Sequence, residues 1–207
     1  MREMKWVIMS LDPRHLDPVV ELHMRAFSDF FLTFLGPRFL KEFYAAFFQE
    51  HSGIAFIAEE EHSGRVLGVV AGTLHPQGFF NRLLKRRWWA FCLASAAALL
   101  SRPRIAPRLF RALFYRGAPP PGPQRTLLSS IAVAPDAKRI GLGHALLDHW
   151  MRSVQNRGSI GCYLITDAIS NDTANLFYQH SGWKSDCSFV TPEGRKMYRY
   201  VIDFRQS

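Results

Sequence analysis

Residues 127–147 read LLSSIAVAPDAKRIGLGHALL, and this stretch decides the fold of the chain. Residues 127–133 form a short apolar run with β-branched members, which predicts a strand. A turn that contains a proline follows at 134–140, and the Gly-Leu-Gly of 141–143 then opens a segment with helical periodicity. The pattern therefore predicts a strand, a basic loop that ends in glycine, and a helix.

This order of elements is typical of an anion-binding site. The N–H groups in the first turn of a helix have no partner inside the helix, and the helix dipole adds partial positive charge at that end. Glycine lets the backbone approach a phosphate closely, because it has no Cβ atom. We therefore expect the loop and the helix start to bind an anion.

The bulk composition limits the class of protein. The chain has 207 residues, of which 48% are hydrophobic, and this is enough for one globular domain with a full core. Its three cysteines are widely spaced and odd in number, which favours reduced thiols. The first 15 residues contain no apolar run of signal-peptide length. We therefore expect a cytoplasmic protein.

The net charge of +9 is concentrated in one segment. Residues 82–116 contain nine arginines and lysines and no acidic residue, so the rest of the chain is close to neutral. Residues 88–100 read WWAFCLASAAALL, which is too short to cross a membrane because a spanning helix needs about 20 apolar residues. We expect two helices in this part, which we assign to an insertion over about 74–124.

Three roles are open to this basic, tryptophan-bearing insertion. The first is packing on its own domain or on a second copy in a homodimer. The second is contact with an anionic membrane surface, as in peripheral attachment to the inner membrane face. The third is binding of a phosphate-bearing acceptor through residues 82–116. Binding of nucleic acid is disfavoured, because the segment is too apolar for an open groove.

Hydrophobic periodicity predicts the remaining elements. The charged stretch 59–64 is interpreted as the turn of a hairpin. Phe30 and Phe31 fall between the first two helices, where they are candidates for the wall of a substrate pocket. The expected helices are at 16–27, from Gly36-Pro37 to about 47, at 141–156 and at 172–180, and the expected strands are at 5–9, 53–58, 65–73, 161–166, 183–190 and 196–204.

The motif V-x-P-x-x-[RK]-x-x-G-x-G, a further strand, then N-x-x-A-x-x-x-Y and Gly-Trp together resemble the GNAT superfamily of acyl-CoA-dependent N-acetyltransferases. Lys138 stands where that family more often has Arg or Gln, and it keeps the positive charge. The close similarity covers about residues 127–183. The matching residues are Val133, Pro135, Lys138, Gly141, Gly143, Asn171, Ala174, Tyr178, Gly182 and Trp183.

The resemblance implies an α+β fold in a single domain over residues 1–207. Its sheet is mixed, mostly antiparallel and twisted, with about seven strands flanked by helices. The element order β-α-α-β-β-β-α-β-α-β-β of this sequence is compatible with it. Residues 74–124 then form a basic, apolar helical insertion between the third and fourth strands.

The resemblance also implies acetyl-CoA as the cosubstrate and no metal. Ile131 and Val133 are expected to pair through their backbone with the pantetheine arm, and the N–H groups of 139–144 to hold the pyrophosphate. Asn171 is expected to hold the pantetheine, to cap the helix that follows it, or both. The full set of expected cofactor-binding residues is Ile131, Ala132, Val133, Lys138, Arg139, Ile140, Gly141, Leu142, Gly143, His144, Asn171 and Tyr178.

Tyr178 is expected to act as the general acid that protonates the leaving thiolate. The family has no fixed general base, so the base is sought among the residues of this chain. Asp167, at the end of the strand before Asn171, is the first candidate, and it can equally cap the loop that follows. Ser129 and Ser130 are expected to hold a relay water beside the acceptor.

The sequence thus predicts an N-acetyltransferase that moves an acetyl group from acetyl-CoA to a primary amine. The acceptor amine attacks directly in a ternary complex, and a small molecule or an amino sugar is the favoured acceptor. The alternative is a membrane-surface or nucleic-acid-binding module that keeps the fold without activity, although such a module would not explain Asn171 or Tyr178.

Overall fold

The computed structural model describes residues 5–27, 33, 36–79, 82, 124–191 and 194–204. Most of the predicted insertion at 74–124 lies outside these residues, as do Phe30 and Phe31. Within the described ranges, none of the helices has both the length and the apolar character needed to cross a membrane.

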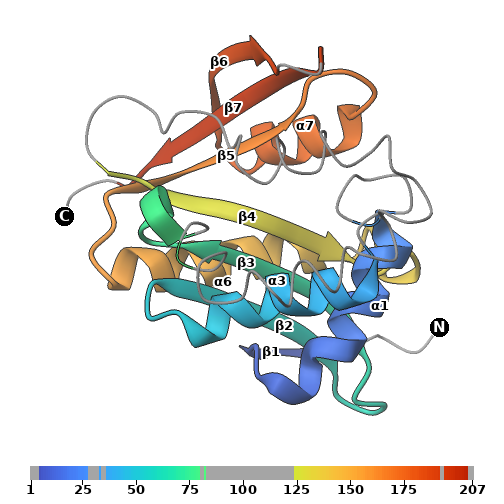
Figure 1. Cartoon of the computed structure of the whole chain (residues 1–207). Coiled ribbons are helices and arrows are strands. Elements are labelled where there is room, and N and C mark those ends of the chain that lie inside the picture. The colour runs from blue at the N-terminus through green and yellow to red at the C-terminus, as the bar shows by residue number, and fades with distance from the viewer. Residues whose placement is uncertain are drawn as a thin grey trace, which may run out of the picture.

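In the described part of the chain, seven strands form one sheet in the order β1-β2-β3-β4-β5-β7-β6 (Figure 1). Neighbouring strands are antiparallel except for β4 and β5, which are parallel. This confirms the predicted α+β fold with a mostly antiparallel sheet. The bounds are β1 Trp6–Ser10, β2 Gly53–Glu60, β3 Val66–Thr73, β4 Thr126–Val133, β5 Gly161–Asp167, β6 Lys184–Val190 and β7 Lys196–Asp203.

Helices cover both faces of the sheet. Figure 1 shows α1 (Leu16–Ala26) and α3 (Pro37–Gln49) in front of strands β2 to β4, and α6 (Leu142–Asn156) behind them. A further helix of the described residues is α7 (Asp172–His180), which follows β5. Every residue of β3 is buried, because this central strand is covered on both faces.

The predicted hairpin turn at 59–64 is shorter than expected. Strand β2 continues through Glu60, because β1 pairs with it as far as Trp6 opposite Glu60. Glu60 Oε2 also accepts a hydrogen bond from Ser63 Oγ within the remaining turn. The charged residues of this stretch therefore close a hairpin.

The aromatic stripe of α3 is core. The helix begins at Pro37, where the missing N–H of proline is harmless because a first-turn N–H has no helical partner. Burial of each large apolar side chain contributes about 1.5–3 kcal/mol. The fully buried side chains of the stripe are Phe39, Leu40, Phe43, Tyr44 and Phe47.

Trp150 fixes α6 against the sheet. Its indole Nε1 donates a hydrogen bond to the carbonyl oxygen of Ile54, at 3.1 Å, and the side chain is fully buried. A Cβ atom at Gly72 of β3 would come within 2.3 Å of the Trp150 ring, so only glycine fits beneath it. This contact holds the second half of α6 against β2 and β3.

The sheet opens between β4 and β5. These strands pair only at Thr126 with Cys162 and at Leu127 with Tyr163, and beyond that point they diverge (Figure 1). The register of β3 against β4 shifts at the same level, so that Ser129 is an extra residue in a β-bulge. Beyond Ser129, strand β4 pairs within the described part of the chain on its β3 side alone.

Candidate active site

The open edge of β4 presents the backbone of two predicted site residues. Ala134 N donates to Leu67 O at 2.8 Å, so the backbone groups of Ala134 face β3. Along an antiparallel strand these groups alternate in direction, so those of Ala132 also face β3 and those of Ile131 and Val133 face the opening. The opening therefore has one wall of unpaired amides, which another extended chain of amides can match.

The loop between β4 and α6 ends at an uncapped helix. Gly141 has φ +83°, a left-handed conformation that favours glycine, and no side chain caps α6 at this position. The first bond of the helix runs from Ala145 N to Gly141 O at 3.0 Å, so the N–H groups of 142–144 have no helical acceptor. The first turn contains no acidic residue. These features together fit an anion.

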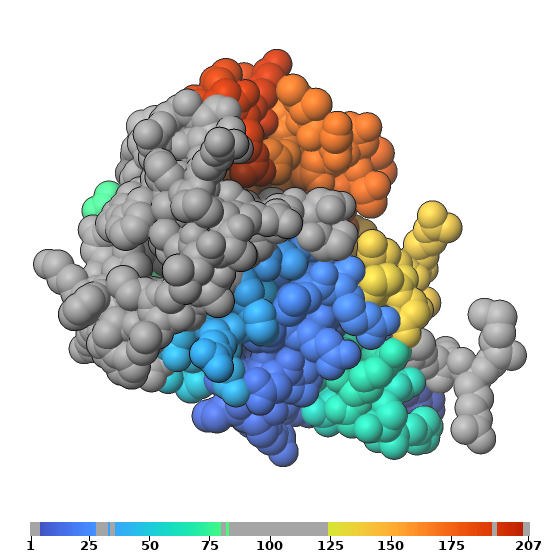
Figure 2. All heavy atoms as spheres, turned by 45° about the vertical axis from the view of Figure 1, so that its right-hand side comes forward, coloured from blue at the N-terminus to red at the C-terminus, as the bar shows by residue number. Residues whose placement is uncertain are grey.

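The same loop lies at the surface with basic side chains exposed. In Figure 2 the yellow loop lies between α7, in orange, and the turn from β2 to β3, in green. Lys138 and Arg139 are both exposed, and Arg139 has φ +66°. The two cations therefore lie close to the free N–H groups of the helix.

Strand β4, helix α6 and helix α7 meet at Gly143. A Cβ atom at this position would lie 3.4 Å from Phe177 Cε2 and 3.7 Å from Val133 Cγ2. The ring of His144 packs on that of Phe177, with centroids 4.7 Å apart, and its Nδ1 lies 3.1 Å from Ser181 Oγ. A larger side chain at 143 would push α7 away from the start of α6.

Tyr178 is a buried phenol on α7. It is 9% exposed, and its ring lies 5.9 Å from that of Tyr200 and 6.1 Å from that of Trp183, centroid to centroid. Burial raises the pKa of the Tyr178 hydroxyl above its usual value, so it keeps its proton at neutral pH. Among the described residues this hydroxyl has no hydrogen-bond partner, which leaves its proton available.

Asn171 ties the end of β5 to α7. It occupies the N-cap position of α7, but its side chain makes no capping hydrogen bond, so the capping role expected for it is wrong. Its Nδ2 instead donates to Thr166 Oγ1 at 2.7 Å and to Asp167 O at 3.3 Å. Asn175 Nδ2 donates to the same carbonyl oxygen at 3.1 Å. Two amides therefore hold the far wall of the opening.

The carboxylate of Asp167 is engaged by Arg195. Arg195 Nε donates to Asp167 Oδ1 at 3.1 Å, and Arg195 Nη2 donates to Asp167 Oδ2 at 2.5 Å. This ion pair could not be predicted from the sequence, because Arg195 reaches Asp167 only through the register of β5 with β7. A role for Asp167 as proton acceptor would require the guanidinium to move.

Ser129 and Ser130 lie at the bulge of β4. Ser129 Oγ is buried and has no hydrogen-bond partner among the described residues. Ser130 Oγ lies 3.0 Å from the hydroxyl of Tyr44, which in turn lies 2.8 Å from His23 Nδ1. His23 and Tyr44 could not be predicted as site residues, because both belong to apolar helix faces, where a polar atom at the end of each side chain was the only signal.

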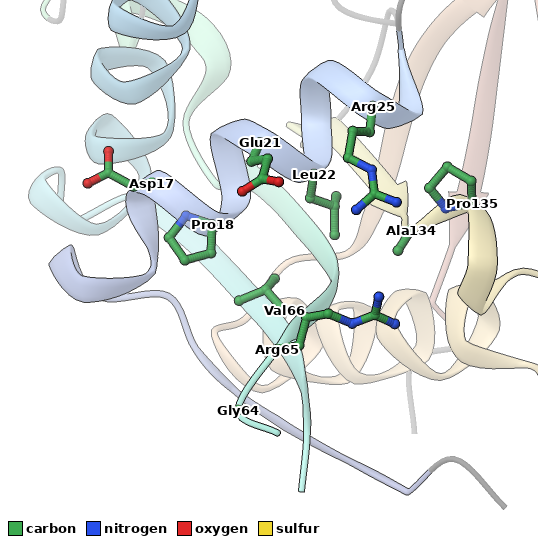
Figure 3. A pocket seen from close by; sticks show the side chains of 10 residues that line it. All are labelled: Asp17, Pro18, Glu21, Leu22, Arg25, Gly64, Arg65, Val66, Ala134 and Pro135. Carbon is green, nitrogen blue, oxygen red and sulfur yellow. The ribbon is translucent and has the colours of Figure 1, made fainter. Parts of the chain in front are cut away.

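A hollow of about 500 Å³ lies between α1, the start of β3 and the end of β4 (Figure 3). Figure 3 shows Arg25 and Arg65 extending toward Pro135, and both pair with Asp136, at 4.0 Å and 2.6 Å. Hydrogen bonding to Arg65 holds the pKa of Asp136 below its usual range. None of the predicted site residues lines the hollow. Its lining is Asp17, Pro18, Glu21, Leu22, Arg25, Gly64, Arg65, Val66, Ala134 and Pro135.

Metal-ligand clusters and disulfides are both missing from the described residues. No three His, Cys, Asp or Glu side chains come together there as metal ligands would. Cys162 and Cys187 are both free thiols.

Comparison with known proteins points to one family. The family model described as Acetyltransferase (GNAT) family matches residues 16–183. No curated protein sequence matches the chain.

Solved structures of the same family have the same fold. A GNAT-family protein from Desulfovibrio desulfuricans matches with a TM-score of 0.65 and 14% identity, over 96% of this chain and 99% of that one. The ribosomal-protein-S18-alanine N-acetyltransferase from Escherichia coli matches with a TM-score of 0.61 and 17% identity, over 98% and 96%. A GNAT acetyltransferase from Brucella melitensis in complex with acetyl-CoA matches with a TM-score of 0.54 and 15% identity, over 99% and 91%.

At these identities the structures show the fold alone, whereas the family model covers well over half of the chain. The resemblance found in the sequence is therefore confirmed. The protein belongs to the GNAT acetyltransferase family and is an acyltransferase with acetyl-CoA as its cosubstrate.

Proposed function

We propose that the protein transfers the acetyl group of acetyl-CoA to the primary amine of a small molecule or an amino sugar, by direct attack in a ternary complex. The observation that carries this proposal is the opening between β4 and β5. The free edge of β4 and the uncapped start of α6 border this opening. Helix α7, which carries the protonated Tyr178, contacts the start of α6 where Phe177 meets Gly143.

The residues around the opening fit acetyl-CoA. The N–H groups of 142–144 and the cations of Lys138 and Arg139 would hold the pyrophosphate. The backbone of Ile131 and Val133 would pair with the amides of the pantetheine arm. Gly143 supports this fit, because any side chain there would fill the space between Val133 and Phe177.

Acetyl-CoA supplies its acetyl group as a thioester, whose C–S bond breaks as the amine nitrogen forms the new C–N bond. Tyr178 is suited to give its proton to the departing sulfur, which keeps the electron pair of the broken bond. Such general acid catalysis contributes about 10²–10⁴-fold. The acceptor nitrogen gives up one proton, and Asp167 stays the first candidate to receive it, provided that Arg195 releases the carboxylate.

The acceptor class is the finer part of the proposal. The notable relative is the Escherichia coli enzyme, whose acceptor is the alanine of a ribosomal protein, so a peptide amine must be tested beside amino sugars. A phosphate-bearing acceptor, an anionic membrane surface and a homodimer all depend on residues 82–116, of which the structure describes Arg82. Neutralising Arg86, Arg87, Arg104 and Arg108 should weaken acetylation of a phosphate-bearing acceptor.

The experiment has two stages. Calorimetric titration of acetyl-CoA into the wild type and into Gly143→Glu should give micromolar binding that the variant loses, because the glutamate crowds Phe177 and adds negative charge to an anion site. Release of free CoA thiol is then followed with kanamycin, spermidine and the peptide Ala-Ala-Ala as acceptors. Turnover of kanamycin supports the amino-sugar proposal, and turnover of the peptide alone overturns it. A wild type that does not bind acetyl-CoA would overturn the whole proposal.

A further inference from the structure

A chain of three polar side chains crosses the core on one side of β4. His23 comes from α1, Tyr44 from α3 and Ser130 from β4. The hydroxyl of Tyr44 lies 2.8 Å from His23 Nδ1 and 3.0 Å from Ser130 Oγ, so both contacts are hydrogen bonds of ordinary length. His23 is 1% exposed and Tyr44 is 0% exposed. We call these three residues the buried relay.

The buried relay ends where the sheet opens. Ser130 follows the bulged residue Ser129, and the last pair between β4 and β5 is Leu127 with Tyr163. Ser130 is partly exposed, whereas the other two members are buried. The relay therefore leads from the layer of α1 and α3 to the point at which β4 loses its second neighbour.

Packing alone does not explain the relay. Tyr44 lies in a stripe whose other aromatic members are phenylalanines, among them Phe43 and Phe47, and a phenylalanine would fill the same place without a polar atom. His23 Nε2 is buried and has no hydrogen-bond partner among the described residues. Buried polar groups cost free energy unless they are hydrogen-bonded, and here the bonds run from His23 through Tyr44 to the partly exposed Ser130, which points to a use at the Ser130 end.

Both buried members of the relay are uncharged at neutral pH. Burial lowers the pKa of His23 to about 4 and raises the pKa of Tyr44. A hydroxyl has one donor and two acceptor positions, and within the described residues Ser130 uses one of these three, toward Tyr44. Ser130 Oγ thus has a free lone pair, whichever way the protons of the relay point.

We propose that Ser130 Oγ accepts a hydrogen bond from the N–H of the acceptor amine, and that Tyr44 and His23 are positioning residues that fix its orientation. This inference rests on the proposed function. Ser130 Oγ contacts α3 through Tyr44, so an acceptor bound to it would approach from the side of α1 and α3, while α6 lies on the other face of the sheet. An amine held by its N–H directs its lone pair at the acetyl carbon, which favours direct attack.

The test uses two CoA thioethers that no turnover can consume. The first, CoA–S–CH₂–C(O)–NH–propyl, contains the N–H that the acceptor contributes. The second, CoA–S–CH₂–C(O)–CH₂–propyl, has a methylene group in its place. Calorimetry should show that the wild type binds the amide about tenfold more tightly than the ketone, because one neutral hydrogen bond distinguishes the two. This preference should vanish in Ser130→Ala and shrink in Tyr44→Phe.

The control variant is Tyr200→Phe, which removes another buried phenol hydroxyl, one that accepts from Gln179 Nε2 at 3.2 Å outside the relay. Its amide preference should equal that of the wild type. Equal preferences in the wild type and in Ser130→Ala would overturn the inference. Failure of the wild type to bind either thioether would instead count against the proposed function, so the two failures are distinguishable.

A kinetic double-mutant cycle gives a second readout. It uses whichever of kanamycin, spermidine and Ala-Ala-Ala the wild type acetylates. Ser130→Ala and Tyr44→Phe should each lower kcat/KM for the amine while the Kd for acetyl-CoA stays within twofold of the wild type. The double variant should be no slower than Ser130→Ala, because Tyr44 acts through Ser130. Effects that multiply in full would show that Tyr44 has a separate, structural role and would overturn the inference.

Discussion

The two faces of β4 are built in different ways. On the α6 face, site residues are backbone N–H groups, a glycine and exposed cations, and most come from the continuous stretch 131–144. On the face of α1 and α3, the corresponding groups are side chains of three elements, separated by 21 residues between His23 and Tyr44 and by 86 between Tyr44 and Ser130. The first face suits a cosubstrate shared by a family, and the second suits an acceptor particular to one protein.

The two faces therefore require different features of the sequence. A backbone site needs a turn, a glycine and a helix start, and all three are local properties. A side-chain site needs distant residues to meet, so its residue types are free to vary with the acceptor. Variants on the two faces should therefore affect different steps: binding of acetyl-CoA on the α6 face, and use of the amine on the other.

The largest effect is expected at Tyr178. A variant there tests whether the group that protonates the leaving sulfur lies on the α6 face. Tyr178→Phe keeps the packing with Trp183 and Tyr200 but removes the hydroxyl that we propose as proton donor to the departing sulfur. We expect kcat to fall about 10²–10⁴-fold with little change in the Kd for acetyl-CoA. Steady-state rates and calorimetry measure the two quantities, and an unchanged kcat would exclude Tyr178 as the general acid.

The next largest effect concerns the face of α1 and α3, where protonation of His23 in the buried relay should lower the stability of the fold. His23 has a pKa of about 4 in the folded protein, against about 6.5 for an exposed histidine. Between these values the unfolded chain binds a proton that the folded protein does not, so stability falls as the pH is lowered from about 6.5 to about 4. The loss from this group is at most about 3 kcal/mol.

Urea unfolding at pH 7, 5.5 and 4 measures this loss of stability when the wild type is compared with His23→Gln, whose side chain does not titrate. Carboxylates titrate in both proteins, so the difference between their slopes isolates His23. The wild type should lose more of its free energy of unfolding than the variant does. Parallel curves would mean that His23 has the same pKa in the folded and the unfolded protein, contrary to its burial.

The sequence predicted the strand and the helices of the α6 face, whereas it did not predict the side-chain contacts of the other face. The strand, loop and helix of 127–156 followed from local pattern, and Tyr178 followed from a motif on one short helix. The bulge at Ser129 was not predicted, because a register shift depends on the pairing of β3 with β4. The partners of Asp167 and Ser130 were missed for the same reason: Arg195 and Tyr44 reach them only after the sheet and the helices have packed.

A smaller effect is expected at Gly143, where α6 contacts Phe177 of α7. Gly143→Ala adds a Cβ atom 3.4 Å from Phe177 and 3.7 Å from Val133, which are ordinary van der Waals distances, so α7 keeps its place and the loss comes from a Cβ atom where the backbone approaches the phosphate. We expect acetyl-CoA to bind about tenfold more weakly, a loss of about 1.4 kcal/mol. Tyr44→Phe is the matched control on the opposite face, and it should leave this Kd unchanged. Equal weakening in both variants would contradict the division between the faces.

The smallest effect concerns the loop that joins the two faces. Asp136, between β4 and α6, is held by Arg65 and Arg25 on the face of α1, so these exposed ion pairs help to fix the loop that we propose to bind the pyrophosphate. Arg65→Ala removes the shorter pair but leaves Arg25, and exposed ion pairs contribute about 0.2–1 kcal/mol. We therefore expect the Kd for acetyl-CoA to rise about twofold to fivefold. Asp136→Asn should have a similar effect, and 0.5 M salt should reduce the difference between wild type and variant, because salt screens the pair. A Kd unchanged in both variants at low salt would show that the uncapped start of α6 holds its position without help from the other face.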